Sequence, residues 1–255
     1  MITVEHEKIK EIPVLHIADK NRWEEKLPFI IFIHGYTSRK EFNLHYAYLL
    51  AEKGFRVILP EALYHGERSS GLSSNELNFH FWEIVLRTID ELEILKQKFE
   101  EQKLIDPSRI GVVGTSMGGI ITLGALTKYP WIKAATSLMA MPYYEKFADL
   151  QINEMKKKGI KIPVSEVEMS QLMSKLRELD LSLQPQKLGN RPLLFWHGKQ
   201  DSVVPYSPTY HFYESIRPLY QEQPERLNFI SEENAGHKVS TEGVMRTIEW
   251  FETYL

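Results

Sequence analysis

Short apolar runs recur along the chain with the length and composition of buried β-strands. They occupy residues 28–33, 56–60, 110–113, 134–140, 192–196 and 227–230. Strands of this kind are buried on both faces of a parallel sheet. The segments between them repeat apolar residues every three to four positions, as amphipathic helices do. This alternation predicts an α/β fold with a doubly wound, mostly parallel sheet, and we expect residues 1–255 to form a single domain.

Two patterns near the amino terminus add local detail. Residues 2–18 alternate loosely between apolar and polar and contain Pro13, which predicts edge strands outside the main sheet. Ser38 is followed three residues later by Glu41, a capping-box pattern that predicts the start of a helix. This helix should end at Gly54.

Residues 142–190 interrupt the alternation because a connection between two strands does not need nearly fifty residues. Within them, Ser165 and Glu168 cap a helix with one apolar side, formed by Leu172, Met173, Leu176 and Leu179. Both ends of the insertion should emerge at the carboxyl edge of the sheet. We therefore expect a helical cap that contributes Leu172, Met173 and Leu176 to a substrate pocket, unless this apolar side only packs the insertion onto the domain.

The central motif of the chain is Gly114-Thr-Ser-Met-Gly118, which lies between the strand at 110–113 and a helix rich in small residues. A sharp reversal from strand to helix brings backbone close to backbone at the two glycines, where a Cβ atom would clash. Ser116 is therefore expected at the tip of the turn. There it meets the amino-terminal end of the helix, which favours a developing negative charge.

With this motif the sequence resembles the α/β-hydrolase family, in particular its small serine carboxylesterases and the catalytic domains of prolyl-oligopeptidase-like peptidases. The resemblance implies a catalytic triad of Ser116, Asp201 and His237, in the family's chain order. Asp201 lies in His197-Gly-Lys-Gln-Asp-Ser-Val-Val-Pro205, which is similar to the family's acid loop, and His237 follows Ala-Gly after the last strand. The acid orients the histidine, and the histidine takes the serine proton.

The resemblance also implies an oxyanion hole made of two backbone N–H groups, those of Tyr36 and Met117, with Thr37 as an alternative to Tyr36. The Tyr36 ring is a candidate for the substrate pocket. His65, in a polar loop after the strand at 56–60, is a second candidate, although a structural role explains it as well.

Composition narrows the function further. A formal net charge of −3 gives no electrostatic footprint for nucleic acid, and the absence of cysteine removes thiolate chemistry. The chain shows neither a signal-peptide pattern nor an apolar stretch long enough to span a bilayer, so we expect no membrane association and a cytoplasmic location. The histidines are not spaced as metal ligands, and no metal or cofactor is expected.

These features together predict a serine hydrolase that cleaves small-molecule carboxylic esters through an acyl-enzyme on Ser116. Two alternatives stay open. One is a peptidase or amidase, because the motif and the Asp201 loop also resemble prolyl-oligopeptidase-like domains. The other is a non-catalytic ligand-binding protein of the same fold. The sequence gives no indication of oligomeric state.

Overall fold

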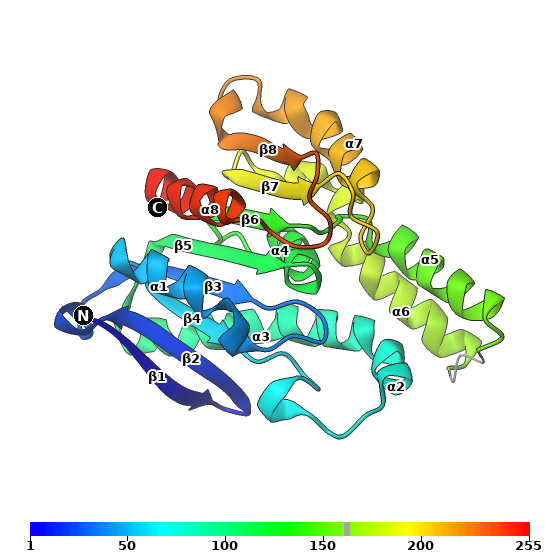
Figure 1. Ribbon diagram of the computed structural model, residues 1–255, viewed down its shortest axis with the longest axis horizontal. Coiled ribbons are helices and arrows are strands. Elements are labelled where there is room, and N and C mark those ends of the chain that lie inside the picture. Colours follow the sequence, from blue (N-terminus) through cyan, green and yellow to red (C-terminus); the bar gives the residue numbers. More distant parts are fainter. Residues whose placement is uncertain (161–163) are drawn as a thin grey trace.

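A computed structural model of the chain describes residues 1–160 and 164–255. Within these ranges, eight strands form one sheet in the order β1-β2-β4-β3-β5-β6-β7-β8 (Figure 1). The strands are β1 (Ile2–Ile9), β2 (Ile12–Asp19), β3 (Leu27–Ile33), β4 (Arg56–Pro60), β5 (Ile105–Thr115), β6 (Ala134–Leu138), β7 (Leu193–Gly198) and β8 (Leu227–Glu232). From β4 to β8 all neighbours are parallel, whereas β2 is antiparallel to both β1 and β4.

The amino-terminal strands correct the sequence-based expectation that they lie outside the main sheet. β2 pairs with β4 from Val14↔Pro60 to Ile17↔Val57, so it continues the sheet, and β1 forms its edge. All but the last residue of β2 are buried. Pro13 is accommodated near the start of the strand, opposite Lys8 of β1.

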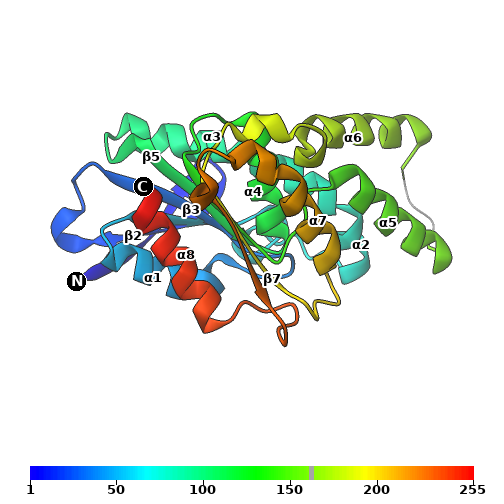
Figure 2. The ribbon, with the colours of Figure 1, turned by 90° about the horizontal axis from the view of Figure 1, so that it is seen from above.

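Helices cover both faces of the sheet, as a doubly wound fold requires. They are α1 (Leu44–Glu52), α2 (Ser74–Phe79), α3 (Phe81–Glu101), α4 (Met117–Lys128), α5 (Tyr144–Lys157), α6 (Glu166–Leu179), α7 (Tyr206–Ile216) and α8 (Thr241–Tyr254). Figure 2 shows α1 and α8 on one face of the sheet and α3, α4 and α6 on the other. The hydrophobic core is divided accordingly, with one cluster on each face. The predicted doubly wound, mostly parallel sheet is thus confirmed.

Helix starts follow the predicted capping pattern in one of two cases. At α6, Ser165 accepts from the backbone N–H of Glu168, whose carboxylate accepts from the N–H of Ser165. Near Ser38 the prediction is wrong, because a 3₁₀ turn occupies Lys40–Asn43 and α1 begins only at Leu44. The carboxylate of Glu41 accepts a hydrogen bond from the Lys40 ammonium instead.

The segment between β6 and β7 contains α5 and α6, which extend beyond the carboxyl ends of the parallel strands (Figure 1). α5 lies near the start of α3, where the Phe147 ring lies 6.0 Å from that of Phe81 and Trp82 Nε1 donates to Gln151 Oε1. This segment therefore borders the sheet edge at which parallel α/β folds bind ligands.

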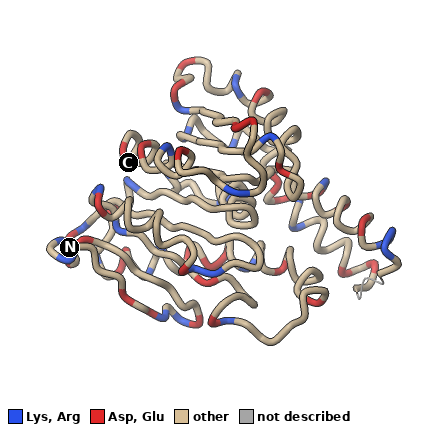
Figure 3. Tube along the Cα trace, viewed as in Figure 1, with Lys and Arg blue, Asp and Glu red and all other residues tan. Residues whose placement is uncertain are grey.

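Positions of Lys and Arg alternate with positions of Asp and Glu along the outer helices and loops (Figure 3). None of the helices in residues 1–160 and 164–255 combines the length and the apolarity that crossing a bilayer demands.

Candidate active site

Ser116 is the single residue between β5, which ends at Thr115, and α4, which begins at Met117. Its φ of 53° and ψ of −116° are strained for a residue with a side chain. The neighbouring glycines explain how the turn closes. A Cβ on Gly114 would lie 2.3 Å from the carbonyl carbon of Gly118, and a Cβ on Gly118 would lie 2.0 Å from Ile33 O. Only glycine fits at either position.

His237 connects Ser116 to Asp201. Its Nε2 lies 2.9 Å from Ser116 Oγ, and its Nδ1 lies 2.7 Å from Asp201 Oδ2. An ionised carboxylate can only accept hydrogen bonds, so Nδ1 carries the proton and Nε2 is free to accept the hydroxyl proton of Ser116. Ser116 comes from the turn between β5 and α4, Asp201 from the loop after β7 and His237 from the loop after β8. The structure joins them in one chain of hydrogen bonds.

Asp201 is held in a fixed orientation by four donors. Oδ1 accepts the backbone N–H groups of Val203 and Val204, each at 2.9 Å. The buried His197 Nε2 lies 3.2 Å from Oδ2, which also faces His237 Nδ1. Burial alone would raise the pKa of Asp201, but hydrogen bonds from His197, His237 and the backbone outweigh it and hold that pKa below its usual range. The carboxylate is therefore ionised at neutral pH.

The turn after β3 approaches the serine from the other side. A Cβ on Gly35 would lie 3.3 Å from Thr115 O and 3.5 Å from Ser116 Cβ, so this turn packs closely against the residue before the nucleophile and against the nucleophile's side chain. The N–H of Thr37 donates to His65 Nε2 at 3.0 Å. Within the part of the chain that the structure describes, the N–H groups of Tyr36 and Met117 have no acceptor. These two amides are the ones that the resemblance assigned to the oxyanion hole.

A cavity of about 440 Å³ opens at Ser116. Its lining is mainly apolar and comes from the turn after β3, from α2 to α4, from α5 and from the Asp201 loop. The apolar lining residues are Tyr36, Phe79, Phe81, Met117, Ile120, Phe147, Met155, Ile160, Val203 and Val204, and the polar ones are Asn75, Asn78, Gln151, Glu154 and Lys158. Burial raises the pKa of Tyr36 to about 12, so its phenol stays neutral, and it donates to Asn78 Oδ1 at 2.9 Å.

The cavity corrects four of the predicted pocket residues. Leu176 is fully buried in the core, whereas Leu172 and Met173 line two other surface hollows that do not include Ser116. The apolar side of α6 packs the insertion onto the domain, which was the alternative interpretation of that pattern. His65 is also buried and bonds to the turn after β3 instead of lining the cavity. Of the predicted pocket residues, Tyr36 does line it.

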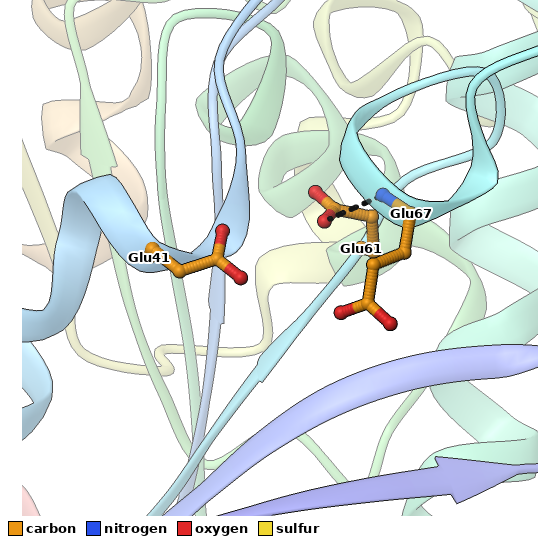
Figure 4. A group of neighbouring side chains, drawn as sticks. All are labelled: Glu41, Glu61 and Glu67. Atoms are coloured by element: carbon orange, nitrogen blue, oxygen red, sulfur yellow. Dashed lines mark hydrogen bonds between the residues drawn. The ribbon is translucent and has the colours of Figure 1, made fainter.

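A cluster of three carboxylates lies behind the same turn. Glu41, Glu61 and Glu67 bring carboxylate oxygens within 4.8 Å of one another (Figure 4). The buried Lys40 ammonium lies 2.7 Å from Glu41 Oε1 and 3.1 Å from Glu61 Oε2 and also bonds Glu67. The Lys40 ammonium bonds all three carboxylates, so the cluster forms a buried ion-pair network.

The family model described as "Prolyl oligopeptidase family" matches residues 40–255. The chain belongs to the prolyl oligopeptidase family. Over the full length of both chains, it is 57% identical to "Putative esterase YitV" of Bacillus subtilis (strain 168) and 29% identical to "Esterase YjfP" of Escherichia coli (strain K12). The prediction of a serine hydrolase is thereby confirmed.

Solved structures show the same fold for this family member. TT1662 from Thermus thermophilus superposes with a TM-score of 0.77 at 21% identity, over 99% of this chain and 98% of the other. The Pyrococcus horikoshii acylaminoacyl peptidase gives a TM-score of 0.70 at 22% identity, but this chain covers only 42% of it. The predicted α/β-hydrolase fold is confirmed.

The sequence analysis missed the contribution of α5 in this family member. Phe147, Gln151 and Met155 recur every four residues along one side of α5 and all line the cavity. That spacing was available in the sequence, but the polar Gln151 in the middle of the series and other apolar residues nearby, such as Leu150 and Ile152, obscure it.

Proposed function

We propose that this family member hydrolyses carboxylic esters through an acyl-enzyme on Ser116, with His237 as base and Asp201 as its orienting acid. The observation that carries the proposal is the hydrogen-bonded chain from Asp201 through His237 to Ser116, at 2.7 and 2.9 Å, beside a mainly apolar cavity. Two full-length relatives that bear the name esterase support it.

The reaction begins when Ser116 Oγ attacks the ester carbonyl carbon while His237 Nε2 takes its proton. The imidazolium that forms is stabilised by the ionised Asp201. Charge develops on the carbonyl oxygen, and the N–H groups of Tyr36 and Met117 are the donors for it. His237 then returns the proton to the departing alkoxide, which leaves as an alcohol.

Deacylation repeats these steps with water. His237 takes a proton from a water molecule as that water attacks the acyl carbon, and it returns the proton to Ser116 Oγ when the carboxylic acid leaves. The same two amides stabilise the second oxyanion. The enzyme is thus restored without any other reactant.

The lining of the cavity bears on the substrate. Phe81, Ile120 and Phe147 offer an apolar surface to an uncharged acyl or alcohol group, and burying such a group stabilises the complex by about 25 cal/mol per Å². The insertion at 142–190 then acts as a cap through α5. Its role is to exclude water and to select the group bound beneath it.

Paired assays separate esterase from peptidase activity. We expect p-nitrophenyl butyrate to be cleaved with a kcat/KM at least about 100-fold above that for aminoacyl p-nitroanilides, because the lining nearest Ser116, with Met117, Ile120 and Phe81, is apolar. Ser116→Ala serves as the blank and should lose several orders of magnitude in kcat. Anilide cleavage at the ester rate would favour a peptidase, and the absence of both activities would favour a ligand-binding protein.

A further inference from the structure

The turn after β3 contains a strained residue next to the proposed oxyanion donor. Thr37 has a φ of +60°, in the left-handed region that β-branched residues avoid. Its side chain is exposed, so packing does not hold it there. Both ends of the Tyr36–Thr37 peptide group are instead hydrogen-bonded: its N–H donates to His65 Nε2 at 3.0 Å, and its C=O accepts the Thr37 hydroxyl at 2.7 Å.

His65 is itself fixed as an acceptor. Its Nδ1 lies 2.8 Å from Leu63 O, which can only accept, so Nδ1 carries the proton and Nε2 presents its lone pair to Thr37. The side chain is 3% exposed, and burial lowers the pKa of His65, so that the ring stays neutral. The ring packs against Tyr36, with centroids 5.7 Å apart.

The preceding peptide group is held as well. Gly35 O accepts from Ser38 N–H at 3.2 Å and from His34 Nδ1 at 2.8 Å. In a trans peptide the N–H points opposite to the C=O, so the Tyr36 N–H is directed away from these two donors. The Tyr36 N–H belongs to this same peptide group, which His34 and Ser38 hold at its carbonyl end. His65 holds the peptide group that follows, so the two together fix the backbone torsions of Tyr36.

We propose that His65 is a positioning residue that holds the Tyr36 N–H toward the developing oxyanion by accepting the Thr37 N–H. The inference rests on the proposed ester hydrolysis. A second consequence is that only one of the two neighbouring backbone N–H groups can serve the oxyanion. The Thr37 N–H is already bonded to His65 and cannot take the place of the Tyr36 N–H. The effect should appear in kcat, because the oxyanion exists only after attack on the carbonyl.

Two variants separate the hydrogen bonds of His65. In His65→Asn the carboxamide replaces Nδ1 and can still donate to Leu63 O, but it is too short to reach Thr37. In His65→Gln the carboxamide oxygen can extend to the position of Nε2 and accept the Thr37 N–H. His16→Asn is the matched control: it removes another buried imidazole, in β2, which β4 separates from β3.

We expect His65→Asn to lower kcat about 10- to 100-fold, with KM within about twofold of wild type. A misplaced oxyanion donor can lower kcat by as much as the deletion of that donor, but no more. His65→Gln should recover at least about fivefold of that loss. His16→Asn should lower the unfolding temperature and leave kcat of the folded protein within twofold. The proposal would be overturned if the kcat loss in His65→Asn were fully explained by a smaller fraction of folded protein. It would also be overturned if His65→Gln lost as much kcat as His65→Asn.

A measurement on the unmodified protein tests the hydrogen bond itself and does not depend on the variants folding. Nitrogen-15 spectra should show His65 as the neutral Nδ1–H tautomer, and the Thr37 amide should exchange with solvent at least about 100-fold more slowly than an unprotected amide. An unprotected Thr37 amide would overturn the inference even if ester hydrolysis by Ser116 holds. Conversely, hydrolysis that survives Ser116→Ala would remove the proposed function while leaving the exchange result intact.

Discussion

Lys40 and Glu61 form an ion pair whose side chains have no exposed surface, with Lys40 Nζ 3.1 Å from Glu61 Oε2. Burial would lower the pKa of Lys40, but hydrogen bonds to Glu41, Glu67 and Glu61 raise it above its usual range. Glu61 Oε1 also accepts the backbone N–H of Lys40 at 3.2 Å. The pair therefore ties the loop after β4 to the 3₁₀ turn at Lys40–Asn43, which follows the turn that carries Tyr36, and removing either partner would leave a buried charge.

The first prediction concerns Glu61→Gln and acid stability. Burial would raise the pKa of Glu61, but contacts with His34 and Lys40 lower it from 4.5 to about 2. A depressed pKa stabilises the folded state above the unfolded value of 4.5, and this stabilisation is lost as pH falls toward 2. We expect the variant to lose roughly 3 kcal/mol of unfolding free energy at pH 6 and much less at pH 3.

Urea unfolding at several pH values measures this difference. Glu101→Gln, an exposed position at the end of α3, is the control and should leave stability nearly unchanged at each pH. The ion-pair account would be contradicted if the unfolding free energies of wild type and Glu61→Gln differed by the same amount at pH 6 and at pH 3.

The second prediction concerns the orienting acid. Asp201→Asn keeps the size of the side chain but places an amide group where Oδ2 accepts the His237 proton, which disfavours the tautomer that leaves Nε2 free. We expect kcat for p-nitrophenyl butyrate to fall about 10³- to 10⁴-fold. A variant that retains full activity would show that another residue orients His237.

The third prediction concerns acyl selectivity, with two neighbouring helices as test and control. Phe147 of α5 lines the cavity at Ser116, whereas Leu172 of α6 lines a separate hollow. Phe147→Ala should enlarge the cavity and shift the kcat/KM ranking from p-nitrophenyl acetate toward the octanoate. Leu172→Ala should leave the ranking as in wild type. The cap does not select the acyl group if both variants rank the esters alike.

The fourth prediction concerns the close backbone contact in the turn around Ser116, between β5 and α4. A Cβ on Gly118 would meet Ile33 O at 2.0 Å, and backbone on both sides leaves little room to adjust. Gly118→Ala should therefore destabilise the fold by several kcal/mol or prevent folding. Gly236→Ala is the control for the loss of a glycine, because the added atom would lie no closer than 3.8 Å to its nearest neighbour, Gln200 O, and the backbone there is not left-handed. Thermal unfolding compares the two, and equal unfolding temperatures would contradict the tight-turn account.

The sequence was sufficient for features that rest on local chemistry. Gly114 and Gly118 indicated a backbone contact in the turn around Ser116 because only glycine permits it. Ser165 with Glu168 indicated the start of α6 because the cap involves four consecutive residues. The parallel strands were visible as apolar runs because both of their faces are buried.

Features that depend on distant partners were not accessible in this way. The Ser38 and Glu41 pattern has the same letters as a cap, but Glu41 bonds to Lys40 in an ion-pair network that involves the loop after β4. The apolar side of α6 looked like a pocket wall, and nothing local shows that Leu176 meets the core while Phe147 of α5 reaches the cavity. Periodicity predicts that a helix has a buried side, but not what covers it.

The measurement that tests the central claim most directly is stoichiometric labelling with a fluorophosphonate, followed by peptide mapping and by ester hydrolysis on the same sample. A serine made nucleophilic by His237 should take up one phosphonyl group per chain, on Ser116 alone. Hydrolysis of p-nitrophenyl butyrate should fall in proportion to labelling, and Ser116→Ala should take up none. An adduct on any other residue, or ester hydrolysis that continues when Ser116 is fully labelled, would contradict the account.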